Sequence, residues 1–309
     1  MISVFIDGAA GTTGLDIAER LGGRSDIALV QIDDARRKDP AARAEALRGA
    51  DFAILCLPDD AAKEAAALAH GSAVRIIDAS SAHRTAAGWT YGLAELSADQ
   101  RSAIADAPRV SNPGCYPTGF LALIAPLVAR GLLPADYPYS VNAVSGYSGG
   151  GKALIARFED DRDIAWRGYG LALGHKHVPE MHVHAGLAHA PIFSPAVIPA
   201  YQGMVVDVPI NRAADSRIAP TDALCAGLVE HYASSALVHV EDMADDGEIL
   251  LRGSGGPSDR MTLSVYANAA GQQIRLLARL DNLGKGAGGA CVQNLNIMAG
   301  LPEVTGLRV

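Results

Sequence analysis

The sequence predicts an α/β fold with a Rossmann-type parallel-sheet domain and a second α/β domain whose sheet is mixed or antiparallel. In the first third of the chain, short apolar runs alternate with helical patterns, which is typical of βαβ units. From about residue 140 onward, longer strand patterns follow one another without a helix between them, which favours a mixed or antiparallel sheet.

The elements expected in the first domain follow one another in strand–helix order. The run Phe52–Leu57 is nearly all apolar, as a strand covered on both faces should be. The predicted strands are Ile2–Ile6, Ala28–Ile32, Phe52–Leu57 and Val74–Ile77, and the predicted helices are Thr13–Leu21, Pro40–Leu47 and Asp59–Ala69.

The second part of the chain carries the longer strand patterns. A turn over residues 268–271 joins two of them, and a glycine-introduced helix is predicted over Ala287–Leu301. The predicted strands are Tyr139–Val144, Met204–Val208, Ala236–Val240, Met261–Tyr266 and Gln273–Leu280.

Composition excludes several classes of protein. With 309 residues and 49% apolar residues, the chain has enough apolar surface for one large domain or two ordinary ones. A formal net charge of −8 disfavours nucleic acid as a partner. The longest apolar stretch, residues 120–128, is too short for a membrane span. Four scattered cysteines without a CxxC pair fit a reducing cytoplasm.

A glycine pattern directly after the first strand indicates a dinucleotide site. Gly8, Gly11 and Gly14 have GxxGxxG spacing, and Thr12 and Thr13 open the helix. Such glycines let the backbone approach a pyrophosphate, and the helix N-terminus offers N–H groups to it. The alternative is a plain glycine turn.

Mixed charges follow the second strand. An acid there usually binds a ribose hydroxyl, whereas nearby cations accept a 2′-phosphate. Asp33 and Asp34 are followed by Arg36, Arg37 and Lys38, and this cation run favours NADP, with Arg36 and Lys38 as ligands. The alternative is a solvated charge run.

Cys115 is the candidate nucleophile. It lies between a Pro-Gly turn and the apolar helix Gly119–Ala129, and a helix N-terminus stabilises a thiolate, which attacks acyl carbons. The other cysteines, Cys56, Cys225 and Cys291, lie in apolar or alanine-rich patterns that predict core positions.

A histidine-rich segment supplies the candidate acid/base group. His175 and His177 are followed by Glu180, which could orient one ring. The segment could also be exposed helix surface or a zinc-like site; we predict no metal, because thiolate and nicotinamide chemistry needs none.

Six further positions are candidate anion or ligand contacts. A glycine loop ending in a cation offers Ser148, Gly149 and Lys152 to the substrate, and Arg84 and Asn112 are further substrate candidates. Asn282 lies in a glycine-rich helix entry that resembles an anion cradle, and it is the remaining cofactor candidate. Ordinary flexible loops are the alternative.

These motifs carry a family resemblance that runs nearly from end to end. Segments 7–14, 111–118, 174–180 and 281–294 resemble N-acetyl-gamma-glutamyl-phosphate reductases in their short, type 2 form, within the semialdehyde dehydrogenase-like family. The resemblance implies an NADP-binding domain over residues 1–114 and a catalytic and oligomerisation domain over residues 115–284. It also implies that a helix within residues 285–309 returns to the nucleotide domain.

The resemblance also implies the reaction. It is the NADPH-dependent reduction of N-acetyl-gamma-glutamyl phosphate to N-acetylglutamate 5-semialdehyde and phosphate, through a cysteine thioester, in arginine biosynthesis. The resemblance implies that Cys115 is the nucleophile and His175 the acid/base group, with His177 as the alternative. The expected enzyme is a cytoplasmic homo-oligomer, dimer or tetramer.

Two other functions remain open from sequence. An aspartate-semialdehyde dehydrogenase-type enzyme would use the same chemistry on a shorter substrate. A non-catalytic NADP-binding sensor could share the Gly8–Gly14 loop but would not need Cys115 together with His175 and His177. The strictness for NADP over NAD and the acyl-amino-acid selectivity are likewise open.

Overall fold

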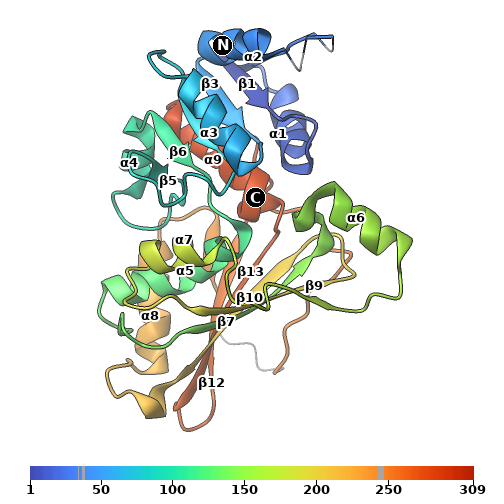
Figure 1. The fold of residues 1–309 in the computed structure, drawn as a ribbon. Helices are drawn as coiled ribbons and strands as arrows, with labels where there is room; N and C mark the ends of the chain where they lie inside the picture. Colours follow the sequence, from blue (N-terminus) through green and yellow to red (C-terminus); the bar gives the residue numbers. More distant parts are fainter. Residues whose placement is uncertain (34, 37–38, 242–246) are drawn as a thin grey trace. The chain divides into compact units, whose positions relative to one another are not determined.

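The computed structural model describes residues 1–33, 35–36, 39–241 and 247–309. The chain forms two compact units (Figure 1). The first contains residues 1–94, 99–114 and 287–307, and the second contains residues 95–98, 115–286 and 308–309. Lys38, Arg37 and Asp34, on which part of the cofactor prediction rests, lie outside the described residues.

The first unit holds a six-stranded sheet in the order β2-β1-β3-β4-β6-β5, with every pair parallel. This confirms the predicted parallel α/β class. Its strands are β1 (Ile2–Asp7), β2 (Ile27–Val30), β3 (Phe52–Leu55), β4 (Arg75–Asp78), β5 (Thr90–Tyr91) and β6 (Arg109–Ser111), and its helices are α1 (Thr12–Gly22), α2 (Pro40–Gly49), α3 (Asp59–Leu68), α4 (Gln100–Asp106) and α9 (Gly289–Met298).

Two strands of this sheet were not predicted from sequence. Strands β5 and β6 have only two and three residues, too few to show a periodic pattern. They are defined by parallel pairing, β6 with β4 and β5 with β6.

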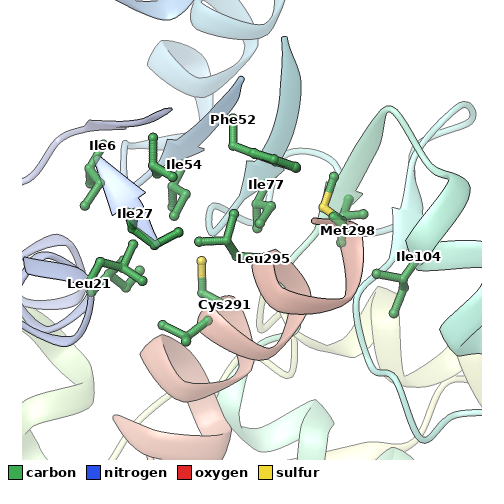
Figure 2. Close-up of a cluster of buried hydrophobic side chains, with 14 of the residues drawn as sticks. Ile6, Leu21, Ile27, Phe52, Ile54, Ile77, Ile104, Cys291, Leu295 and Met298 are labelled. Carbon is green, nitrogen blue, oxygen red and sulfur yellow. The ribbon is translucent and has the colours of Figure 1, made fainter. Parts of the chain in front are cut away.

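Helix α9 completes the core of the first unit, although it lies almost two hundred residues further along the chain (Figure 2). Cys291, Leu295 and Met298 are buried in one apolar cluster with strand residues such as Ile54 and Ile77. Burying a leucine fully is worth about 1.5–3 kcal/mol. The C-terminal segment is therefore a structural part of the first unit.

The second unit holds a seven-stranded mixed sheet in the order β11-β12-β13-β10-β7-β9-β8, which confirms the predicted mixed class. Pairs β7–β9 and β11–β12 are parallel and the others antiparallel. Its strands are β7 (Ser140–Gly146), β8 (Arg167–Gly168), β9 (Ile192–Ile198), β10 (Met204–Asn211), β11 (Val238–Val240), β12 (Met261–Ala267) and β13 (Gln273–Leu280), and its helices are α5 (Cys115–Ala129), α6 (Gly151–Asp160), α7 (Val178–His184) and α8 (Thr221–Tyr232).

Helix α5 is almost entirely buried, because it is apolar on all sides. It packs on strands β10 and β13 and on helices α7 and α8. A Cβ at Gly119 would lie 2.8 Å from a methyl carbon of Val206, so the missing side chain lets the helix approach the sheet closely. This packing fixes the position of Cys115 at the start of the helix.

Strand β9 was also missed from sequence. Its seven residues include Pro195, which weakens a strand pattern, and it pairs in parallel with β7 and antiparallel with β8. Among the described residues, no helix is both long and apolar enough to span a bilayer.

Candidate active site

The glycine loop after β1 has the backbone geometry of a phosphate cradle. Gly8 has φ +89°, and a Cβ there would overlap the carbonyl oxygen of Cys56. A Cβ at Gly14 would lie 2.5 Å from the carbonyl oxygen of Gly8. Helix α1 begins at Thr12, and no side chain caps it at Gly11, so its first N–H groups are available to a ligand.

The segment between β2 and α2 carries the charges expected to select the nucleotide. Arg36 is 55% exposed and forms ion pairs with Asp39 at 3.6 Å and with Glu45 at 4.0 Å. An exposed cation with loosely held partners can turn toward a phosphate at little cost. Asp33 is also exposed.

A buried carboxylate that the sequence analysis did not single out ends β1. Asp7 accepts hydrogen bonds from Arg43 of helix α2 at 2.7 and 3.2 Å. This bonding raises the pKa of the Arg43 guanidinium, so the ion pair stays charged. It ties α2 to the carboxyl end of β1, the edge at which Rossmann-type sheets bind ligands.

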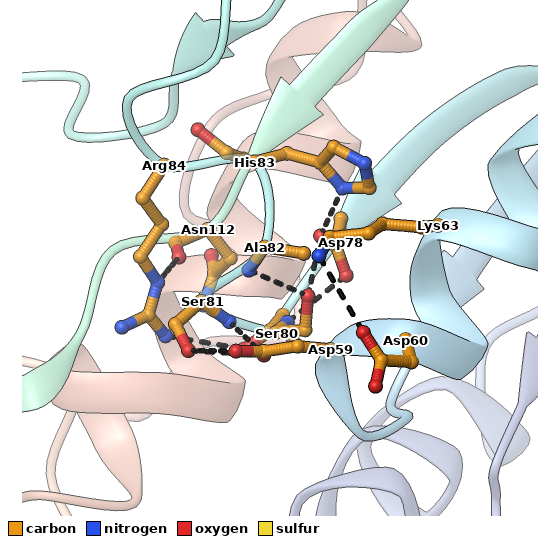
Figure 3. A network of polar contacts seen from close by, with 12 residues as sticks. Asp59, Asp60, Lys63, Asp78, Ser80, Ser81, Ala82, His83, Arg84 and Asn112 are labelled. Atoms are coloured by element: carbon orange, nitrogen blue, oxygen red, sulfur yellow. Dashed lines mark hydrogen bonds and ion pairs between the residues drawn. The ribbon is translucent and has the colours of Figure 1, made fainter. Parts of the chain in front are cut away.

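A polar network lies beyond the carboxyl end of β4 (Figure 3). Asp78 is fully buried and accepts hydrogen bonds from the Ser80 N–H at 2.9 Å and the Ser80 hydroxyl at 2.7 Å. It also pairs with His83 Nδ1 at 2.6 Å, and the His83 ring stacks on Trp89 at 4.0 Å. These contacts hold the loop that carries Arg84.

The structure brings two predicted substrate residues, Arg84 and Asn112, together in this network. Arg84 donates to the carbonyl oxygens of Asn112 at 3.0 Å and Ala79 at 3.1 Å, and it is only 8% exposed (Figure 3). The Asn112 amide donates to the carbonyl of Ala287 and accepts from Asn294 at 3.1 Å. These bonds hold the chain three residues before Cys115.

Cys115 is the first residue of α5 and is partly exposed. The partial positive charge of a helix N-terminus stabilises a thiolate at this position. The next residue, Tyr116, is buried, and its hydroxyl donates to the carbonyl of Ala196 at 3.2 Å and accepts from Tyr169 at 3.3 Å.

The two tyrosines near Cys115 remain neutral. Burial, followed by the proximity of Tyr169 and Cys115, raises the pKa of Tyr116 far above its usual range. Burial raises the pKa of Tyr169 as well. Tyrosines that stay protonated are hydrogen-bond donors, and both lie close enough to interact electrostatically with Cys115.

His175 is half-buried and lies beside several aromatic rings. Its ring centroid lies 5.4 Å from that of Tyr169, 5.1 Å from that of Phe193 and 4.7 Å from that of His177. Its Nδ1 accepts a hydrogen bond from the backbone N–H of His177 at 3.1 Å. A neutral ring held in this way carries its proton on Nε2.

His177 and Glu180 lie at the start of α7. His177 is the N-cap residue and is 7% exposed, and its ring lies 5.9 Å from that of Tyr116. Glu180 is in the first turn and 1% exposed, where the helix dipole favours a carboxylate. The two histidines therefore meet in a turn, neither on a strand nor on one helix face.

Asn282 and the glycine loop after β7 form one cluster in the second unit. The Asn282 amide donates to the Ser148 hydroxyl at 2.9 Å, and its oxygen accepts from the Gly203 N–H at 2.9 Å. A Cβ at Gly149 would lie 3.2 Å from the Asn282 amide nitrogen. Lys152 is exposed on helix α6.

Two aromatic residues near Cys115 were not predicted from sequence as part of the site. Tyr116 directly follows Cys115, and that adjacency was a signal for its role. Tyr169 carries no local motif, since only the pairing of β8 with β9 brings it to the hydroxyl of Tyr116. Within the described ranges, no group of three or more His, Cys, Asp or Glu residues could hold a metal ion.

Comparisons with known proteins place these features in a family. Residues 28–105 match the model of the semialdehyde dehydrogenase NAD-binding domain, and residues 115–282 match that of the semialdehyde dehydrogenase dimerisation domain. An N-acetyl-gamma-glutamyl-phosphate reductase of Trichormus variabilis is 49% identical over 317 residues, covering 98% of each chain. The enzyme of the same name from Burkholderia ambifaria is 51% identical over 308 residues, covering 96% of each chain.

Solved structures support the fold. Aspartate semialdehyde dehydrogenase II from Vibrio cholerae superposes with a TM-score of 0.71 at 15% identity, covering 97% of this chain and 98% of that one. Aspartate semialdehyde dehydrogenase with NADP from Candida albicans superposes with a TM-score of 0.67 at 13% identity, covering 97% of this chain and 98% of that one. At such identities the likeness concerns the fold alone.

Proposed function

The chain belongs to the N-acetyl-gamma-glutamyl-phosphate reductase family of semialdehyde dehydrogenases, and we propose that it reduces N-acetyl-gamma-glutamyl phosphate with NADPH, using Cys115 as nucleophile. The observation that carries the proposal is the position of Cys115 at the start of buried helix α5, beside neutral Tyr116 and Tyr169. Tyr169 in turn contacts the ring of His175. The products are N-acetylglutamate 5-semialdehyde and phosphate, as arginine biosynthesis requires.

The role of Cys115 follows from thiolate chemistry. Its sulfur attacks the acyl carbon, a C–S bond forms, and the bond to the phosphate oxygen breaks, leaving a thioester. When bound, the nicotinamide supplies the hydride that reduces this thioester. The resulting thiohemiacetal oxyanion re-forms the carbonyl, the C–S bond breaks, and the thiolate is regenerated with release of the semialdehyde.

We assign to His175 the acid/base role, in which its Nε2–H donates the hydrogen bond that stabilises the oxyanion until the carbonyl re-forms. The bond from the His177 N–H to Nδ1 leaves Nε2 as the proton-bearing atom of the neutral ring. A fixed donor of this kind stabilises charge that develops in the transition state. His177 is the alternative acid/base, and buried Glu180 supports the turn that carries both residues.

The nucleotide site is assigned to the first unit. The Gly8, Gly11 and Gly14 backbone, with the N–H groups of Thr12 and Thr13, fits a pyrophosphate because it forms a tight turn at a helix N-terminus, in which side chains at Gly8 and Gly14 would collide with backbone oxygens. The family has a nicotinamide nucleotide, and we assign NADP because Arg36 is exposed and flanked by further cations. Asn282 is the remaining nucleotide contact in the proposal.

The substrate contacts we assign are Asn112, Ser148, Gly149 and Lys152, with Arg84 holding the segment before Cys115. The Ser148–Asn282 bond orders the loop after β7, and exposed Lys152 is a cation for a carboxylate or phosphate. We further propose a homo-oligomer, because residues 115–282 match a dimerisation domain. A cytoplasmic location fits the four free thiols.

The assay that tests the function runs the reaction backwards. N-acetylglutamate 5-semialdehyde should support NADP reduction only when phosphate is present, because phosphate must release the acyl group from Cys115. Aspartate semialdehyde at the same concentration should be oxidised at least about tenfold more slowly. Equal rates would point to the aspartate-semialdehyde enzyme, and no turnover with either aldehyde would leave an NADP-binding sensor.

A further inference from the structure

One partner of a buried ion pair lies in the turn that touches Cys115. The Lys285 ammonium lies 2.8 and 2.7 Å from the two carboxylate oxygens of Glu95, and the two side chains are 1% and 3% exposed. Removing two charges from water is costly, and apolar residues of similar size often serve stability as well. The pair therefore points to a role other than stability alone.

Lys285 lies in a short π-helical turn, Gly284–Gly288, which precedes α9. A Cβ at Gly286 would lie 2.9 Å from the Cβ of Cys115, and a Cβ at Gly284 would overlap the carbonyl oxygen of Ser258. The glycines on both sides of Lys285 thus have neighbouring atoms too close to leave room for a side chain. π-turns of this kind occur frequently at functional sites.

Glu95 provides a fixed anchor for the lysine. It belongs to residues 95–98, which pack within the second unit, and its carbonyl oxygen lies 2.8 Å from His231 Nε2 on helix α8. Helix α8 packs on helix α5, whose first residue is Cys115. The Lys285–Glu95 bonds therefore tie the turn to the same scaffold that carries the nucleophile.

We propose that Lys285 and Glu95 are positioning residues, whose ion pair holds Gly286 against Cys115 and so sets the orientation of the thiol. This rests on the proposed function, in which Cys115 is the nucleophile. Two directed bonds to one carboxylate define where the ammonium lies, whereas an apolar contact would leave the turn free to shift. A displacement of about 1 Å at a reacting atom costs about 100-fold in rate.

The test compares Lys285→Met and Glu95→Gln with the double variant Lys285→Met/Glu95→Met in the full-length protein. The readouts are the melting temperature, kcat and KM, and the rate of iodoacetamide alkylation of Cys115 from pH 5 to 9, followed by peptide mass spectrometry. Arg217→Met is the matched control, because it removes an ion pair with Asp136 from a side chain that is 58% exposed.

We expect the single variants to lose stability, because each leaves a buried charge or polar group without its partner. The double variant should recover most of the melting temperature, yet its kcat should stay about 100-fold low and its alkylation profile altered, with KM within about threefold. The Arg217→Met control should match the wild type in every readout.

Two results would overturn the proposal. A double variant with both the wild-type kcat and the wild-type alkylation profile would show that the pair serves stability only. Folded single variants with unchanged Cys115 alkylation would show the same. If Cys115 in the wild type reacts no faster with iodoacetamide than Cys225, the proposed nucleophile itself is wrong. This outcome distinguishes a failure of the proposed function from a failure of the positioning role alone.

Discussion

At the scale of single residues, the reactive centre depends on which groups can change their charge. Burial and the nearby Asp78 and Asp7 raise the pKa of Cys56 to about 12, and burial raises the pKa of Cys291 well above its usual range. Both thiols stay protonated and inert at neutral pH. Cys115 differs from both because it is the first residue of a helix, where the N-terminus stabilises a thiolate.

Replacing Cys115 tests the covalent step. Cys115→Ser should lower kcat by at least about 10³-fold, because a serine hydroxyl is a poor nucleophile near pH 7 without a dedicated base. NADP affinity, measured by fluorescence titration, should change little. Cys291→Ala serves as a control for thiol loss; a serine variant that keeps more than about a hundredth of the activity would contradict the thioester mechanism.

Replacing each of the two histidines should affect a different kinetic parameter. His175→Asn should lower kcat by about 10²–10⁴-fold, the range expected for losing a general acid/base group. His177→Asn should raise KM mainly, because its side chain lies beside Tyr116 and its backbone N–H still reaches residue 175. Steady-state kinetics over pH 6–9 measures both; the reverse pattern would move the acid/base role to His177.

At the scale of elements, two segments far apart in sequence have separate roles in the first unit. They are helix α9 and the segment between β2 and α2. Helix α9 packs against α1 and α4 and fills the apolar cluster on one side of the parallel sheet (Figure 2). The segment between β2 and α2 bears the cations that we assign to the nucleotide. The first feature concerns stability and the second concerns cofactor choice, so each can be changed without the other.

Truncating a buried side chain of α9 should destabilise the first unit. Leu295→Ala removes a leucine with no exposed surface, and such changes cost about 2–5 kcal/mol through lost transfer energy and a residual cavity. The control is Leu15→Ala on α1, which is 51% exposed and should stay within about 0.5 kcal/mol of the wild type. Urea unfolding measures both, and equal midpoints would contradict the packing.

Removing the cation run should change cofactor preference. Alanine at Arg36, Arg37 and Lys38 together should weaken NADP binding by about ten- to a hundredfold, because a charge-assisted phosphate contact contributes about 1.5–3 kcal/mol. NAD affinity should be unaffected, since NAD lacks the 2′-phosphate. Isothermal titration with both nucleotides provides the measurement; an equal loss for both would identify a solvated charge run.

At the scale of the whole molecule, buried thiols and phenols should make stability sensitive to high pH. The buried groups with displaced pKa values include Cys56, Tyr116, Tyr232 and Cys291, and burial raises the pKa of each. On the acid side, hydrogen bonds from Ser3 lower the pKa of Asp51, but that carboxylate is exposed. Surface carboxylates contribute little to stability.

The melting temperature should therefore fall steadily above about pH 9. These thiols and phenols are neutral when folded but ionise near their ordinary pKa values of 9.0 and 10.0 when unfolded, so rising pH favours the unfolded chain. Differential scanning fluorimetry from pH 4 to 11 measures the effect. Cys56→Ala should reduce the slope above pH 9, whereas Leu15→Ala should leave it unchanged; a flat profile to pH 11 would contradict the assignment.

The amino-acid pattern was enough to predict the fold class, which the structure confirms, and to propose where a dinucleotide loop and a nucleophile would lie. These depend on local chemistry: a buried strand is apolar, a tight turn beside a phosphate needs Gly8 and Gly14, and a thiol at the start of a helix is stabilised there. Strand periodicity likewise indicated a mixed second sheet, which the structure confirms.

Which distant groups meet depends on tertiary packing. Strands β5 and β6 exist through pairing, Tyr169 reaches Tyr116 through the β8–β9 ladder, and Lys285 meets Glu95 across 190 residues of chain. No local pattern encodes such contacts, because each depends on how separate elements pack. His175 and His177 are close in sequence, yet the hydrogen bond from the His177 N–H to His175 Nδ1 forms only once the chain has adopted this turn. That bond then sets the tautomer of the neutral His175 ring.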